Sequence, residues 1–137
     1  MPKRVLIVED HAPTRLVIRT ILESEKVDPV EVVVAATGEE ALKMADGGVV
    51  DLVLLDVNLP DMDGFSVCRT LRGWGLQMPI IFVTGERELK DYKAGREAGG
   101  DSYVIKPVSR AALKSLVSLF LSVERKPSGE PEPEPAE

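Results

Sequence analysis

A chain of 137 residues, 44% of them hydrophobic, has the size and polarity of one folded domain. Its formal net charge is −6, and residues 1–125 carry 16 basic against 19 acidic side chains, which argues against direct binding to nucleic acid. One cysteine, Cys68, cannot form an internal disulfide, and no apolar stretch approaches the roughly 20 residues of a membrane span, so we expect a soluble cytoplasmic protein with no membrane partner.

Short apolar runs rich in β-branched residues predict five strands, at residues 5–8, 30–35, 52–55, 80–84 and 103–105. The segments between and after them show helical spacing and predict five helices, at 13–23, 38–45, 64–72, 88–98 and 109–123. Because the apolar runs lack polar alternation, the strands are expected to be covered on both faces. We therefore predict an α/β fold, a doubly wound five-stranded parallel sheet with helices on both faces.

Three residues are predicted to begin helices as N-caps, because their side chains can accept a hydrogen bond from the first helical turn: Thr37, Asp63 and Ser109. Residues 126–137 consist mainly of proline and glutamate, and such a segment cannot bury apolar surface. We interpret residues 1–125 as the domain and residues 126–137 as a disordered tail or linker.

Polar side chains stand where the predicted strands end. The first strand is followed by Glu9 and Asp10, the third by Asp56, the fourth ends in Thr84, and the fifth is followed by Lys106. In an open α/β sheet the carboxyl ends of the strands form the ligand-binding edge, so these five side chains should lie together. Clustered carboxylates raise each other's pKa and cost stability unless something neutralises them, so a chance arrangement of surface residues explains them poorly.

A hard cation would neutralise the carboxylates. Mg²⁺ takes oxygen ligands and is usually held by one or two carboxylates together with phosphate oxygens, which fits Glu9, Asp10 and Asp56. Lys106 then suits a phosphate oxygen as a point charge, and Thr84 can donate a hydroxyl to another. Because a carboxylate can attack a phosphoryl group to give an aspartyl phosphate, and Asp56 follows the central strand, Asp56 is our candidate nucleophile.

The segments VLIVED, LVLLDVNLPDMDG, IIFVTG and AGGDSYVIKP, taken together and in this order, resemble the receiver domain of two-component response regulators of the chemotaxis type. The resemblance covers residues 3–123 and implies the flavodoxin-like strand order 2-1-3-4-5. It also implies Asp56 as phosphoacceptor, the backbone carbonyl of Asn58 as a further metal ligand, Thr84 and Tyr103 as switch residues, and a cis peptide between Lys106 and Pro107.

The resemblance implies a phosphoprotein of signal transduction rather than an enzyme with turnover. A histidine kinase or histidine phosphotransfer protein would donate the phosphoryl group to Asp56 with Mg²⁺ as cofactor, either directly or as a step of a phosphorelay, and autodephosphorylation would remove it. The resemblance also implies that Asn58 and Glu86 influence the lifetime of the phosphoryl group. The face of the fourth helix, fifth strand and fifth helix would then signal to a downstream protein, a fused output domain or a second copy.

Two alternatives stay open: a flavin- or nucleotide-binding protein of the same architecture, and a pseudo-receiver that acts as a constitutive interaction module. The loop EDHAPTR weakens the first, because its two acids would repel a phosphate without a cation. In the sequence DMDG we expect a turn and a helix cap rather than a calcium loop or a phosphatase motif. His11 is expected to be a solvated loop side chain. Gly100 stands where receivers usually have alanine, which removes a methyl group and adds backbone freedom, and the sequence does not specify the consequence.

Overall fold

The computed structural model describes residues 2–24, 29–85 and 89–122, so Glu86 and the predicted tail 126–137 lie outside the described residues. Five strands alternate with five helices along the chain. The strands are β1 (Lys3–Val8), β2 (Val30–Ala35), β3 (Leu52–Leu55), β4 (Ile80–Thr84) and β5 (Ser102–Ile105). The helices are α1 (Ala12–Glu23), α2 (Gly38–Ala45), α3 (Gly64–Gly73), α4 (Leu89–Glu97) and α5 (Arg110–Ser122).

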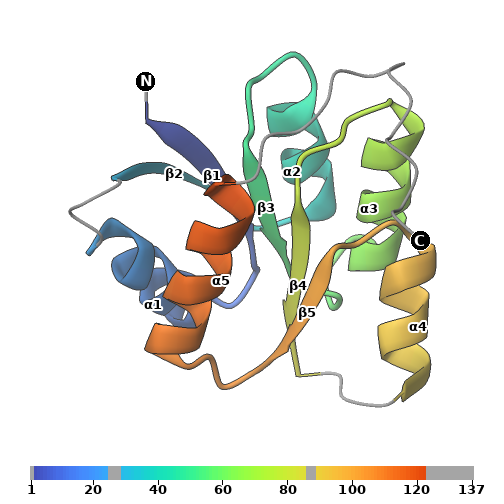
Figure 1. Ribbon diagram of the computed structural model, residues 1–137. Coiled ribbons are helices and arrows are strands. Elements are labelled where there is room, and N and C mark those ends of the chain that lie inside the picture. The colour runs from blue at the N-terminus through green and yellow to red at the C-terminus, as the bar shows by residue number, and fades with distance from the viewer. Residues whose placement is uncertain (1, 25–28, 86–88, 123–137) are drawn as a thin grey trace, which may run out of the picture.

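All strands are parallel and lie in the order β2-β1-β3-β4-β5, which confirms the predicted doubly wound sheet (Figure 1). Strand β1 begins two residues earlier than its apolar run, because Lys3 and Arg4 pair in register with Val30 and Glu31 of the edge strand β2. The guanidinium of Arg4 also lies 3.2 Å from the Glu31 carboxylate. An apolar run therefore marks the buried part of a strand rather than its full length.

Helices cover both faces of the sheet and give it two separate cores. On one face α1 and α5 pack on alternate residues of the central strands, in a cluster that contains Val5, Ile7, Ile18, Leu22, Leu54, Val83, Leu113 and Val117. On the other face lie α2, α3 and the end of α4, in a cluster that contains Leu6, Val8, Ala41, Val53, Leu55, Val67, Leu71, Phe82 and Ala98. Figure 1 shows the sheet between these two layers. Among the described residues, no helix is long and apolar enough to cross a membrane.

The three predicted caps are confirmed by hydrogen bonds at the helix starts. The side chains of Thr37, Asp63 and Ser109 accept from backbone N–H groups at distances of 3.1, 2.8 and 3.3 Å. His11, expected to be a simple loop residue, also begins a helix. Its Nδ1 lies 3.3 Å from the backbone nitrogen of Thr14, which donates to it, so the imidazole caps α1. The prediction that its side chain is exposed is correct.

Gly100 receives a structural explanation from its neighbour Phe82. A Cβ added at Gly100 would lie 2.4 Å from Cε2 of the Phe82 ring, closer than carbon atoms can approach. The fully buried ring packs edge-on against Phe65, with 5.2 Å between ring centroids. The methyl group that is absent at residue 100 thus makes room for an aromatic side chain on β4.

Candidate functional site

The candidate site lies at the carboxyl edge of the sheet, the lower edge in Figure 1. Strands β1 and β3 are paired so that Val8 is opposite Leu55, and the next residues along each chain are Glu9 and Asp56. The backbone N–H of Asp56 donates to the carbonyl oxygen of Val8 at 3.0 Å, which extends the pairing by one step. Sheet register alone therefore brings these two carboxylates side by side.

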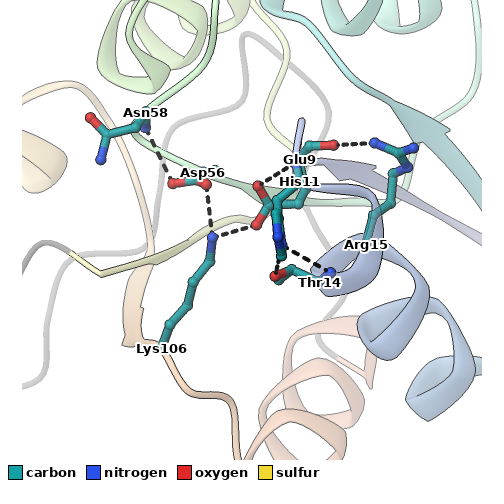
Figure 2. Close-up of polar contacts among 7 residues, drawn as sticks. All are labelled: Glu9, His11, Thr14, Arg15, Asp56, Asn58 and Lys106. Atoms are coloured by element: carbon teal, nitrogen blue, oxygen red, sulfur yellow. Dashed lines mark hydrogen bonds and ion pairs between the residues drawn. The ribbon is translucent and has the colours of Figure 1, made fainter.

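The carboxylates of Glu9 and Asp56 are buried, with 2% and 5% of each residue exposed, whereas Asp10 is exposed. Lys106, which follows β5, reaches between the two buried acids. Its ammonium donates to Asp56 Oδ2 at 2.8 Å and to Glu9 Oε1 (Figure 2). A side chain from the opposite half of the chain thus compensates two acids that would otherwise be buried beside each other.

Burial and neighbouring charges change the proton affinities of this group. The pKa of Glu9 is raised to about 7, first because burial disfavours its charged form and further because of Asp56, while the hydrogen bond from Lys106 opposes the rise. Burial acts to lower the pKa of Lys106, but its hydrogen bonds to Asp56 and Glu9 outweigh burial and raise it. The ammonium is therefore held in its charged form.

The donor set fits a divalent cation. Glu9, Asp10 and Asp56 each offer a carboxylate oxygen, and these oxygens lie within 4.8 Å of one another. Oxygen donors of this kind suit a hard cation such as Mg²⁺. The backbone N–H of Asn58 donates to Asp56 Oδ1 at 3.2 Å, so the chain just after Asp56 folds back onto the carboxylate. Three carboxylates in one place also give a cation the charge that it needs.

The two expected switch residues lie on the same side of the site but not in the acidic cluster. Thr84 is fully buried at the end of β4, and its carbonyl oxygen accepts from the backbone N–H of Lys106 at 2.9 Å. Tyr103, on β5, is partly buried, and its ring centroid lies 4.5 Å from that of Tyr92 on α4. The peptide bond between Lys106 and Pro107 is cis.

Two groups beside the site were not singled out from the sequence. A guanidinium nitrogen of Arg15 donates to the carbonyl oxygen of Glu9 at 2.7 Å, and so brings a positive charge from α1 toward the acids (Figure 2). Thr14 Oγ1 lies 2.6 Å from the capping nitrogen of His11. An arginine that follows a pair of acids in the next helix is weak sequence evidence for a site residue, because most arginines face solvent.

The DMDG segment is used structurally, as expected. The side chain of Asp63 caps α3. The carboxylate of Asp61 accepts from the backbone N–H groups of Gly38 and Glu39, so both acids bind backbone groups of the chain. The expectation missed that Asp61 serves a different helix, α2. Cys68 is buried, and burial raises the pKa of its thiol to about 11, which disfavours the reactive thiolate.

Comparison with known proteins identifies relatives over most of the chain. A family model described as "Response regulator receiver domain" matches residues 5–118. The chain is 38% identical over 121 residues to the alkaline phosphatase synthesis transcriptional regulatory protein PhoP of Bacillus subtilis, covering 88% of this chain and 49% of the relative. It is 41% identical over 122 residues to the transcriptional regulatory protein AfsQ1 of Streptomyces coelicolor, covering 88% and 52%. The chain spans about half the length of these curated relatives.

Solved structures show the same fold. A CheY-like response regulator receiver domain protein from Methanospirillum hungatei superposes with a TM-score of 0.82 at 33% identity, over 88% of this chain and 94% of the other. A putative response regulator from Chloroflexus aurantiacus gives a TM-score of 0.82 at 30% identity, over 90% and 100%. The similarity therefore extends across nearly the whole of these two solved chains.

Proposed function

Because this chain belongs to the response regulator receiver domain family, we propose that it is a phosphorylation-controlled signalling module whose phosphoacceptor is Asp56. Receivers take part in two-component signalling as phosphoacceptors rather than as classical enzymes. The observation that carries the assignment is the position of Lys106, whose ammonium hydrogen-bonds to both Asp56 and Glu9 at the carboxyl edge of the sheet. A buried acid with a cation at hydrogen-bonding distance is suited to receive an anionic group.

In the proposed transfer, a carboxylate oxygen of Asp56 attacks the phosphorus of a phosphohistidine on a histidine kinase or histidine phosphotransfer protein. A phosphorus–oxygen bond forms as the bond from phosphorus to the imidazole nitrogen breaks, and the electron pair stays with the imidazole. Lys106 donates to an oxygen of the incoming group, and the hydroxyl of Thr84 donates to another. Autodephosphorylation would follow by attack of water on the same phosphorus: the bond from phosphorus to the Asp56 oxygen breaks, its electron pair returns to the carboxylate, and inorganic phosphate leaves. Asn58 and Glu86 would influence the rate.

Mg²⁺ is the cation that we propose for the acidic cluster, because receiver domains bind it at an acidic pocket and three carboxylates meet here. Glu9, Asp10, Asp56 and the backbone carbonyl of Asn58 would hold it. When bound, it supplies positive charge that stabilises the phosphoryl oxygens during transfer. Glu9 and Asp56 would then keep their negative charge although they are buried, because a dication compensates them.

The response of the fold is proposed to start at Thr84 and Tyr103. Movement of the Thr84 hydroxyl toward the phosphoryl group would leave space that the ring of Tyr103 enters. The face formed by α4, β5 and α5, with the exposed cations Lys90, Lys93 and Arg96, would change with it. A downstream protein, a fused output domain or a second copy of the chain would bind this face in one of its two states.

Intact mass measured after incubation with a small-molecule phosphodonor tests the assignment. The chain should gain the mass of one phosphoryl group with Mg²⁺ and none after chelation of the metal. Asp56→Asn should gain none, whereas Asp63→Asn should gain one as the native chain does, because asparagine also caps a helix and Asp63 lies outside the acidic cluster.

A gain that survives Asp56→Asn would refute Asp56 as the phosphoacceptor. If the folded native chain gains no mass from a small-molecule donor or from a phosphorylated kinase, the protein is a constitutive binding module. The same phosphorylated sample reports two further properties. The decrease of the phosphorylated fraction after removal of the donor gives the lifetime of the phosphoryl group. Light scattering shows whether two copies of the chain associate.

A further inference from the structure

The β3–α3 loop, residues 57–63, is joined to the start of helix α2 by one side chain. The carboxylate of Asp61 accepts the backbone N–H of Gly38 through Oδ1 at 2.8 Å and that of Glu39 through Oδ2 at 2.9 Å. These residues are more than 20 positions apart in the sequence and come from opposite sides of β1 in the sheet. Asp61 thus links two loops at the carboxyl edge that the sheet alone leaves unconnected.

Packing reinforces the link. Met62, the next residue of the loop, lies directly against Gly38, where an added Cβ would come within 2.5 Å of the methionine Cγ. Because residue 38 is a glycine without a side chain, the loop can approach the start of the helix closely. The hydrogen bonds from Gly38 and Glu39 also lower the pKa of Asp61, so its carboxylate stays ionised at neutral pH.

The other end of the loop is held against the phosphoacceptor strand. The backbone N–H of Gly64 donates to the carbonyl oxygen of Val57 at 2.7 Å, and Asn58 forms a β-bridge with Asp63. A Cβ at Gly64 would lie 2.2 Å from the carbonyl oxygen of Asp56, so this closed turn requires glycine. A loop whose ends are held together is compact, so we expect the contacts at its tip to fix its position.

The start of α2 does not depend on Asp61 alone. Thr37 Oγ1 accepts from the backbone N–H of Glu40 at 3.1 Å, and the Glu40 carboxylate accepts from the N–H of Ala36 at 3.1 Å. This reciprocal pair caps the helix from within its own segment. The two bonds of Asp61 therefore do more than complete a helix end, because they fix the distance between α2 and the tip of the β3–α3 loop.

We propose that Asp61 is a positioning residue for the cation site: by tying the β3–α3 loop to α2, it holds the backbone carbonyl of Asn58 and the carboxylate of Asp56 in the arrangement that binds the metal. This inference rests on the proposed function. The residue does not contact the acidic cluster. It acts through the closed turn between Asn58 and Gly64, in the way that outer hydrogen bonds orient the ligands of other metal sites.

The test is a calorimetric titration of the full chain with Mg²⁺ in the absence of any phosphodonor. Asp61→Ala removes both hydrogen bonds and should weaken Mg²⁺ binding by about tenfold, the lower end of what loss of an outer-shell partner costs. Asp61→Asn keeps one acceptor oxygen and should fall between Asp61→Ala and the native chain. The matched control is Thr37→Ala, which removes a cap from the same helix but leaves the link to the loop intact.

Urea unfolding of the same variants separates positioning from stability. Thr37→Ala should lower the unfolding midpoint while its dissociation constant for Mg²⁺ stays within about twofold of the native value, because the β3–α3 loop is untouched. The inference is wrong if Asp61→Ala binds Mg²⁺ as the native chain does, or if Thr37→Ala weakens binding as much. If Asp61→Ala does not fold, the comparison of Asp61→Asn with Thr37→Ala decides in the same way.

Phosphorylation kinetics give a second readout. For Asp61→Ala the Mg²⁺ concentration at half-maximal rate should rise, while the rate at saturating Mg²⁺ stays close to native, because bound metal restores the arrangement of the Asp56 carboxylate and Lys106 is unchanged. Failure of the native chain to bind Mg²⁺ or to accept a phosphoryl group would overturn the proposed function. A native chain that does both, together with an Asp61→Ala variant of native affinity, would overturn this inference alone.

Discussion

Glu9 is the most deeply buried of the three acids, and burial raises its pKa. The pKa of Glu9 is about 7 in the folded protein, whereas the pKa of a glutamate in the unfolded chain is 4.5. The folded protein therefore keeps this proton to a higher pH than the unfolded chain does. Between these values the folded state binds more protons than the unfolded state, so stability must fall as pH rises. A residue that would hold a metal therefore weakens the metal-free fold at neutral pH.

Unfolding in urea, without divalent cations and at several pH values, should show this effect. The free energy of unfolding of the native chain is expected to decline between pH 4.5 and about 7 relative to that of Glu9→Gln, which cannot ionise. The difference between the two proteins isolates Glu9, because other titrating groups contribute to both. Equal pH dependence of the two proteins would show that Glu9 titrates as it does in an unfolded chain.

Strand β4 packs against the segment before β5, where the large ring of Phe82 lies beside Gly100, which has no side chain. The ring of Phe82 fills the space that a side chain at residue 100 would occupy, and Gly95 on α4 also lies close to the ring. Gly100 does not have a positive φ, unlike Gly99 with φ of 103°. The backbone at residue 100 therefore tolerates other residues, and only packing excludes them.

A double-mutant cycle measures this match. Gly100→Ala should destabilise the protein by about 1–3 kcal/mol, the usual cost of an extra methyl group in a filled core. In the Phe82→Leu background, which lacks the ring atoms nearest to residue 100, the same change should cost at least about 1 kcal/mol less. Urea unfolding gives all four stabilities. Additive effects of the two changes would mean that the ring moves aside without cost.

The fold was predictable because its strongest signal is local. Runs such as residues 52–55 and 80–83 are apolar throughout, since both faces of the central strands are buried, and helical spacing lies between them. The acids of the site were also predictable, because residues that follow parallel strands meet at one edge of a sheet. The confirmed caps depended on the same kind of short-range pattern.

Contacts between distant segments were not predictable where they lie away from the ends of the strands. Asp61 binds the start of α2 only because β1 lies between β2 and β3, and nothing near Asp61 in the sequence specifies that partner. The match of Phe82 with Gly100 depends on the distance between β4 and the turn before β5. His11 was missed for a different reason, because histidine is an uncommon helix cap and a lone histidine suggests other roles.

The ammonium of Lys106 is a positive charge of the chain itself that lies in the proposed cation site. This ammonium contacts Glu9 Oε1 and Asp56 Oδ2, so a metal that binds these two oxygens would exchange with a tethered ammonium rather than enter an uncompensated pocket. Lys106→Met should therefore lower the stability of the metal-free protein and slow phosphoryl acceptance. It should also tighten Mg²⁺ binding measured by calorimetry. Unchanged or weaker Mg²⁺ binding would contradict the exchange. Under the proposed function, the native protein would bind Mg²⁺ more weakly than its three carboxylates alone would, because the ammonium of Lys106 would have to give up its contacts to Glu9 and Asp56.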